Sequence, residues 1–361
     1  MKAVSRFSKW FFYLALLPLV LGFSAWQGWA WWSWAQSPVV SASSTEEEKA
    51  VQIQIPPGTA GQKIGKDLEA AGLIRSSYAW KLWSYWLRFN DSQGGFKAGT
   101  YKLSPTQPLP AIANTIWKGE VMQVSFTIPE GWSLQQMATY FEAQGFFKAQ
   151  DFLNAASQDY KDKFPWLPDG LPHLEGFLYP DTYQLPSDRM SSQQVIQQML
   201  SRFEQVALPL YQQARNQTKL SLMEWVTLAS IVEKEAVIPE ERPRIAGVFT
   251  SRLQKGMRLE TDPTVEYGLG IRQTMNQPLT LAQVRTPNEY NTYLNPGLPP
   301  TPIASPGVAS LKATLYPEKT DFLYFVARYD GSHVFSRTLA EHEAAAAAIR
   351  QQINSQQKPP S

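Results

Sequence analysis

The 361-residue sequence contains no cysteine, which excludes a disulfide scaffold, a thiolate metal site and a cysteine nucleophile. It has only three histidines, and these are scattered along the chain at His173, His333 and His342. A multi-histidine metal site is therefore poorly supplied, and we expect neither a metal nor a cofactor. The formal net charge of +2 lacks the basic excess of an electrostatic nucleic-acid binder, so we expect no nucleic-acid partner.

Charge is missing altogether from one long stretch near the N-terminus. Residues 10–45 contain no Asp, Glu, Lys or Arg, and residues 10–35 are apolar apart from Gln27 and a few serines. A helix needs about 20 such residues to cross a bilayer. The positive-inside rule places the preceding residues 1–9 in the cytoplasm, because they carry Lys2, Arg6 and Lys9. The sequence thus predicts a cytoplasmic stub, a single membrane-spanning helix over residues 10–35, and a body outside the plasma (inner) membrane.

Tryptophans gather at the outer end of this stretch, as in an aromatic belt at a membrane interface: Trp26, Trp29, Trp31, Trp32 and Trp34. The alternative is a cleaved signal peptide, which has a shorter apolar core and ends in small residues. The Trp-rich end lacks such a cleavage site, so the pattern favours a retained anchor.

After a Ser/Thr/Glu-rich linker at residues 36–49, a short pattern occurs twice. An alternating strand at 51–55 is followed by Pro-Pro-Gly and an amphipathic helix at 59–72. A strand at 124–128, Pro-Glu-Gly and a helix at 133–145 repeat this order. Each copy resembles the LysM module, a small glycan-binding fold, although strand–turn–helix is also a common unit on its own. We expect a LysM-like βα subdomain over residues 50–125, with a helix at 78–89 and a strand at 96–103.

The remaining body, residues 126–352, predicts a mixed α+β domain. Apolar periodicity indicates helices at 191–207, 221–236 and 244–255, and an Ala-rich helix at 339–352. Residues 321–328 are typical of a buried strand, and the polar tail 353–361 is expected to be disordered. The fold class is therefore α+β, with an N-terminal transmembrane helix, a LysM-like βα subdomain and a mixed α+β domain over residues 126–352.

One predicted helix carries a candidate acid. Leu228, Ile231 and Val232 form an apolar stripe, and the next position on that stripe is Glu235, whereas Glu233 lies nearer the polar face. Desolvation raises a carboxyl pKa, and a carboxyl that is still protonated near neutral pH can act as a general acid. The alternative is a structural glutamate paired with one of two nearby arginines, Arg242 or Arg244.

Three loops combine aromatic, amide, hydroxyl and carboxylate side chains, at residues 173–183, 257–268 and 290–300. Aromatic faces stack on sugar rings, and amides and hydroxyls bond sugar hydroxyls. Asn, Asp, Gly and Pro also dominate ordinary turns, which accounts for any one of these loops. Three of them beside an acid-bearing helix favour a glycan cleft.

The strings GFLYPDTY, ASIVEKE, DPTVEYG, YNTY, GLPP and FLYFVARYDGSHVFSRTLAEH, in this order, resemble the endolytic murein transglycosylase (YceG-like) family. The resemblance covers roughly residues 50–350. It implies a membrane-anchored lytic transglycosylase that cuts the β-1,4 bond between N-acetylmuramic acid and N-acetylglucosamine in nascent peptidoglycan strands without water. It also implies a partner among wall-synthesis enzymes.

Carried onto this chain, the resemblance places the catalytic acid and base in Glu-Lys-Glu, at Glu235 with Glu233 as the fallback. The expected substrate-binding residues are Glu175, Tyr179, Asp181, Thr261, Asp262, Tyr290, Asn291 and Tyr293. His333 either borders the site or is structural. The chain departs from the family pattern at Glu260, where Gln is common, and at Glu343, where Asn is common, which bears on substrate preference.

Two other functions stay open at this point. The first is a non-catalytic, membrane-anchored glycan-binding or scaffold protein of the wall-synthesis complex. The second is a hydrolase that uses water and a second carboxylate, either Glu175 or Asp262.

Overall fold

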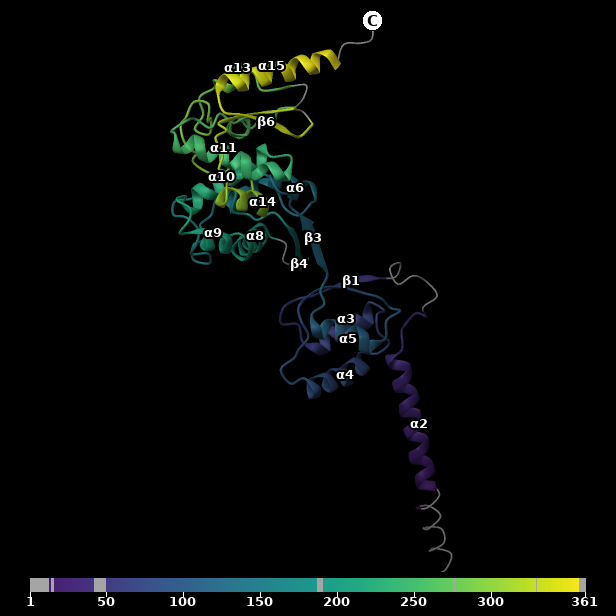
Figure 1. Ribbon diagram of the computed structural model, residues 1–361. Coiled ribbons are helices and arrows are strands. Elements are labelled where there is room, and N and C mark those ends of the chain that lie inside the picture. Colours follow the sequence, from purple (N-terminus) through teal and green to yellow (C-terminus); the bar gives the residue numbers. More distant parts are fainter. Residues whose placement is uncertain are drawn as a thin grey trace, which may run out of the picture. The chain divides into compact units, whose positions relative to one another are not determined.

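The computed structural model describes residues 13, 16–41, 50–186, 191–274, 277–328 and 330–356. The chain forms two compact units, which we call unit 1 (Met1–Val124 with Gln184–Arg189) and unit 2 (Ser125–Tyr183 with Met190–Ser361) (Figure 1). The predicted cytoplasmic stub, the first residues of the predicted membrane helix except Tyr13, most of the linker and the last five residues of the tail lie outside the described residues.

Helix α2, Leu17–Gln36, covers most of the predicted membrane helix and contains no charged residue. Within the described ranges, no helix combines the length and apolar character needed to cross a membrane. The C-terminal end of α2 belongs to the core of unit 1, because Ala35 is fully buried and Trp32 packs against the same cluster. The Arg75 guanidinium fixes the chain after α2 by donating to the Pro38 carbonyl at 2.7 and 2.9 Å.

Unit 1 continues with β1 (Val51–Ile55), α3 (Gly61–Ala70), α4 (Ser77–Asn90), β2 (Gly99–Leu103) and α5 (Leu109–Lys118). β1 and β2 pair antiparallel, so that the first residue of β1 lies opposite the last residue of β2. The fully buried Trp80 stacks on Phe96 and donates its indole N–H to the Gly61 carbonyl at 2.8 Å. The predicted strands at 51–55 and 96–103 and the helices at 59–72 and 78–89 are confirmed, with ends shifted by one to three residues.

The second strand–turn–helix copy is β3 (Gln123–Thr127) and α6 (Leu134–Ala143). A capping box between Ser133 and Gln136 starts α6. β3 pairs with β4 (Thr182–Pro186), whereas β1 pairs with β2. The two copies thus share a local order of elements but pair with different strands, and the LysM-like character of residues 50–125 stays a prediction.

Unit 2 is a mixed α+β body in which α10 (Leu222–Glu235) is central. All eight residues from Trp225 to Val232 are buried, and the Trp225 indole donates to the Leu311 carbonyl of α14 at 3.0 Å. In Figure 1 the hairpin of β5 and β6 and helix α15 lie at one end of this unit, with α8 and α9 toward the other. The remaining elements are α7 (Ala149–Ala156), α8 (Ser192–Val206), α9 (Leu208–Ala214), η4 (Pro239–Glu241), α11 (Arg242–Gln254), α12 (Asp262–Leu269), α13 (Leu281–Val284), α14 (Val308–Leu315), β5 (Tyr324–Ala327), β6 (His333–Ser336) and α15 (Leu339–Gln356).

Three expectations for this unit are wrong in part. Residues 257–268 are not all loop, because α12 (Asp262–Leu269) begins there with Pro263 in its first turn. The residue that caps its C-terminal end, Gly270, is left-handed with a φ of 64°. The strand at 321–328 is shorter and is not buried, since β5 belongs to a two-stranded hairpin. Residues 353–356, which were expected to be disordered, belong to α15, which continues to Gln356.

Candidate active site

Glu235 is the last residue of α10 and lines a cavity of about 760 Å³ together with Asp262, Glu266 and Tyr293. The Thr261 hydroxyl donates to its Oε1 at 2.5 Å. Burial, opposed by that hydrogen bond and assisted by the charges of Asp262 and Glu266, raises the pKa of Glu235 from 4.5 to about 7. A carboxyl with this pKa, facing an open cavity, can both give and accept a proton near neutral pH.

Glu233, only two residues earlier, lies in a different environment. Its side chain is 6% exposed, and its two oxygens accept from Arg242 Nη2 at 3.5 Å and from the Gly307 amide at 3.1 Å. The predicted polar face for Glu233 is therefore wrong, because α10 is packed on all sides along most of its length. The arginine pairing considered for Glu235 belongs to Glu233, and no ion pair of Glu235 occurs within the described part of the chain.

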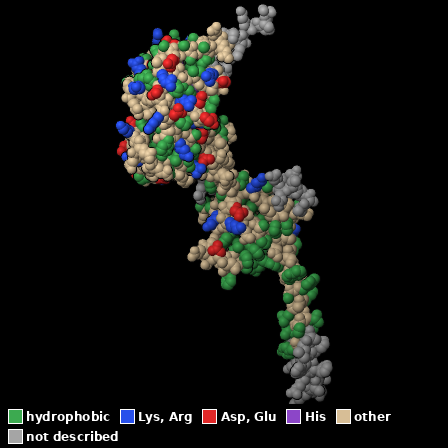
Figure 2. Space-filling model, in the orientation of Figure 1, with side chains coloured by type: hydrophobic (Ala, Val, Ile, Leu, Met, Phe, Trp, Pro, Cys, Tyr) green, Lys and Arg blue, Asp and Glu red, His purple; other side chains and the backbone are tan. Residues whose placement is uncertain are grey.

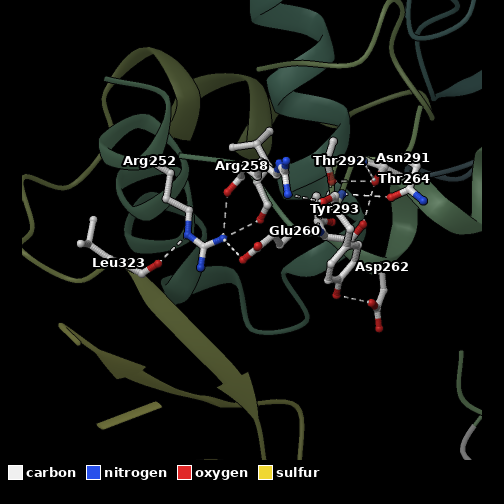
Figure 3. Close-up of polar contacts among 11 residues, drawn as sticks. Arg252, Arg258, Glu260, Asp262, Thr264, Asn291, Thr292, Tyr293 and Leu323 are labelled. Carbon is white, nitrogen blue, oxygen red and sulfur yellow. Dashed lines mark hydrogen bonds and ion pairs between the residues drawn. The ribbon is translucent and has the colours of Figure 1, made fainter. Parts of the chain in front are cut away.

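The segment that presents Thr261 is held in a strained conformation. Glu260 has a φ of 51° and is the only non-glycine residue with a positive φ among the described residues, at a cost of about 1–2 kcal/mol. Arg252, on α11 and 6% exposed, holds this segment. Its guanidinium donates to the carbonyl oxygens of Leu323, Arg258 and Leu259 at 2.6, 3.0 and 2.9 Å and contacts the Glu260 carboxylate at 3.3 Å (Figure 3). No sequence motif predicted this role of Arg252.

The other face of the cavity is a polar network on α12 and the loop after α13. The Tyr293 hydroxyl donates to Asp262 Oδ1 at 2.7 Å (Figure 3). Burial raises the pKa of Tyr293, so its hydroxyl stays a neutral donor. Asn291 is 1% exposed and donates to the carbonyls of Val284 and Thr286 at 2.9 Å. Asn291 therefore shapes the loop that carries Tyr293, and its amide is used within the protein.

A second cavity, of about 670 Å³, is lined by Glu175, another carboxyl whose pKa is raised. Glu175 is 1% exposed and accepts from the Leu134 amide at 3.1 Å and from the Tyr267 hydroxyl at 3.0 Å. Burial raises its pKa from 4.5 to about 7. Tyr290 lines the same cavity, and its hydroxyl lies 2.9 Å from Thr301 Oγ1.

The two cavities adjoin, because four residues line both of them: Lys234, Pro263, Glu266 and Arg272. Together the cavities form a two-lobed cleft with Glu235 in one lobe and Glu175 in the other. Lys234 and Arg272 were not among the predicted site residues. Lys234 stands inside the Glu-Lys-Glu string, and this was the signal that could have identified it.

Four expected site residues are not among the described residues that line the two cavities: Tyr179, Asp181, Thr261 and Asn291. Thr261 nevertheless contacts Glu235, and Asn291 supports the loop of Tyr293. Tyr179 is buried and its carbonyl accepts from the Tyr183 hydroxyl, and Asp181 pairs with Arg202 at 2.6 Å. His333 lines the larger lobe, and its Nδ1 lies 2.7 Å from Glu241. Within the described ranges, no group of three or more His, Asp or Glu side chains could hold a metal ion.

Residues 53–348 match the YceG-like family. The chain belongs to this family. A Bacillus subtilis protein named endolytic murein transglycosylase is 33% identical over 313 residues, which cover 83% of this chain and 85% of that protein. A Streptococcus pneumoniae protein of the same name is 32% identical over 333 residues, 82% of this chain but only 59% of the longer relative. The crystal structure of a YceG-like protein from Listeria monocytogenes is 34% identical with a TM-score of 0.57, and covers 82% of this chain and 99% of that one. The family resemblance drawn from the sequence motifs is confirmed.

Proposed function

We propose that this YceG-like protein is an endolytic peptidoglycan lytic transglycosylase that cleaves the MurNAc–GlcNAc β-1,4 bond and leaves 1,6-anhydro-MurNAc ends. The relatives named endolytic murein transglycosylase support this activity. The observation that carries the proposal is Glu235: a carboxyl with a pKa of about 7 at the wall of an open cleft, held by the Thr261 hydroxyl.

Glu235 performs both proton transfers in this mechanism. Its protonated form gives the proton to the glycosidic oxygen as the C1–O bond breaks. The resulting carboxylate takes the proton of the muramoyl 6-hydroxyl as that oxygen bonds to C1, which closes the anhydro ring and restores the acid. The Thr261 hydrogen bond stabilises the carboxylate between the two steps. The neighbouring charges of Asp262 and Glu266 stabilise positive charge that develops at C1.

The shape of the cleft supports cleavage within a strand rather than at its end. Internal cleavage needs a cleft that holds several sugars of one strand on both sides of the scissile bond, and two adjoining lobes that share Lys234 and Glu266 offer this length. Tyr293 lines one lobe and Tyr290 the other, so each lobe offers an aromatic ring to a sugar.

We further propose that residues 10–35 form a single-pass anchor in the plasma (inner) membrane, with residues 1–9 in the cytoplasm. The catalytic domain, residues 126–352, which follows the LysM-like subdomain in the sequence, then lies outside the membrane, where it terminates nascent strands beside wall-synthesis enzymes. The uncharged α2 with its exposed Trp26, Trp29 and Trp34 supports membrane attachment.

The test is digestion of purified peptidoglycan by the full chain, with product analysis by mass spectrometry. We expect 1,6-anhydro products from the wild type and a loss of activity of about 10²–10⁴-fold in Glu235→Gln, which keeps the shape but cannot release a proton. Glu233→Gln on the same helix is the matched control and should keep activity of the wild-type order. Thermal unfolding of both variants checks that they fold.

Each alternative has its own result. Reducing-end muramic acid would show a hydrolase that uses a second carboxylate, and Glu175→Gln would then abolish activity. Loss in Glu233→Gln with activity retained in Glu235→Gln would move the acid to the fallback residue. Binding of glycan strands by a wild-type protein that never cleaves them would show a glycan-binding or scaffold protein.

A further inference from the structure

Helix α4 has an exposed aromatic stripe that the enzymatic function does not use. Tyr78, Leu82, Tyr85, Trp86 and Phe89 follow the spacing i, i+4, i+7, i+8 and i+11, which puts them on one side of the helix. Phe89 is 88% exposed and Tyr78 59% exposed, whereas Ala79, Trp80 and Leu87 form the buried face. We call these five residues the α4 stripe.

The chemistry of the stripe suits a lipid surface. Trp and Tyr are enriched at bilayer interfaces, where their rings sit among headgroups and acyl chains. α4 contains no Asp or Glu, and its polar face carries Lys81 and Arg88. Basic residues beside an apolar aromatic face complement the anionic headgroups of phospholipids.

Ring contacts join the stripe to α2. Trp31 of α2 lies 5.8 Å from Tyr78 between ring centroids, and Trp32 stacks on Trp83 at 6.3 Å. Trp83 in turn lies 4.7 Å from Trp86. Hydrophobic side chains gather on the part of unit 1 that adjoins α2 (Figure 2). The stripe is therefore continuous with the uncharged helix assigned above to the membrane.

We propose that the α4 stripe inserts into the headgroup–acyl boundary of a phospholipid bilayer, so that α4 lies in the membrane interface beside α2. This inference rests on the proposed membrane attachment of α2. As a consequence, unit 1 has a fixed orientation on the bilayer. Attachment through both α2 and α4 prevents unit 1 from rotating about the α2 axis, which attachment through α2 alone would allow.

The absence of native cysteine allows a direct test with single-cysteine variants of the full chain, each carrying a nitroxide label. Phe89→Cys reports on the α4 stripe. Arg88→Cys, at the preceding residue and outside the stripe, is its matched control. Leu21→Cys reports on α2, and Leu281→Cys, 73% exposed in unit 2, reports on bulk water. The protein is reconstituted in vesicles of phosphatidylethanolamine and phosphatidylglycerol, and label collision with oxygen and with a water-soluble nickel chelate is measured.

We expect the label at residue 89 to collide several-fold less with the nickel chelate and more with oxygen than the labels at residues 88 and 281. A label at 89 that stays in water while the label at 21 is shielded would overturn this inference alone. Labels in water at both positions would also overturn the proposed attachment of α2. If the label at residue 89 is shielded from the nickel chelate without lipid, and its spectrum shows dipolar broadening between labels, a second copy of the chain covers the α4 stripe. If only added glycan strands shield the label, the stripe binds glycan. Either result would overturn the proposal.

Discussion

Thr261 sets the acidity of the proposed catalytic carboxyl, and Thr261→Val tests this directly. Valine keeps the branched shape but removes the hydroxyl that donates to Glu235 Oε1 at 2.5 Å. A hydrogen bond to a carboxylate stabilises the charged form, so its loss should raise the pKa of Glu235 above its wild-type value of about 7. The enzyme would then keep its general acid protonated at higher pH.

The size of the effect follows from the strength of that bond. A hydrogen bond to a charged group is worth about 1.5–3 kcal/mol, and the lower end applies because Glu235 is partly exposed. About 1.4 kcal/mol corresponds to one pH unit. With the midpoint near 7, about one-tenth of the wild type is protonated at pH 8. If the midpoint moves up by about one unit, this fraction rises to about one-half, so activity at pH 8 relative to the acidic plateau rises about fivefold.

The assay is kcat/KM for release of anhydro products from pH 5 to pH 9, since this ratio reports the pKa of the free enzyme. Thr274→Val is the control, because Thr274 lines the same lobe without contacting Glu235. A midpoint that moves to lower pH in Thr261→Val, or does not move while the variant stays folded, would refute the assignment of Glu235 as the titrating acid.

Three further variants test the scaffold. Because the pKa of Glu175 is raised from 4.5 to about 7, its contribution to the free energy of unfolding is fully present below pH 4.5 and is lost as the pH rises through 7, about 3 kcal/mol in total. Glu175→Gln should remove this pH-dependent part of the free energy of unfolding, which urea titrations at each pH measure. Gly247→Ala would place a Cβ 2.2 Å from the Glu318 carbonyl oxygen and should lower the free energy of unfolding by about 1–3 kcal/mol, whereas Gly95→Ala, which meets open space, should not. In Arg252→Lys the ammonium group cannot reproduce the forked contacts of the guanidinium, so kcat on glycan strands should fall about ten- to a hundredfold. An unchanged kcat would show that the segment before Thr261 does not need this support.

The sequence predicted the positions of helices and strands better than it predicted their burial and pairing. Helices α8, α10 and α11 follow from local apolar periodicity and lie where they were expected. Whether β5 is buried depends on how many strands pair with it, which the eight residues 321–328 do not encode. Helix α12 was missed although Asp262, Pro263 and Gly270 are regular start and stop signals, because the polar and aromatic residues around them were interpreted as a binding loop.

The candidate site likewise contains residues that the sequence predicted and residues that it did not. Thr261, Asp262 and Tyr293 come together beside Glu235, as the motif order implied. Arg252 was not predicted, because its carbonyl partner on Leu323 lies 71 residues away and only folding brings the two together. At Asp181 the turn alternative describes what the structure shows, since its carboxylate accepts from the next amide and from Arg202.

The contrast between Glu233 and Glu235 shows what selects an acid on a buried helix. The hydrophobic stripe does not select it, because α10 is apolar all round and Glu233 is buried as well. The partners of the two carboxyls differ: Glu233 contacts the Arg242 guanidinium and the Gly307 amide, whereas Glu235 accepts from one hydroxyl and has two acidic neighbours. Glu235 is also the last residue of the helix, where the negative end of the helix dipole disfavours a carboxylate. The end of the helix therefore supplies both access to the cleft and a proton held near neutral pH at Glu235, whereas Glu233, two residues earlier on α10, lines neither lobe.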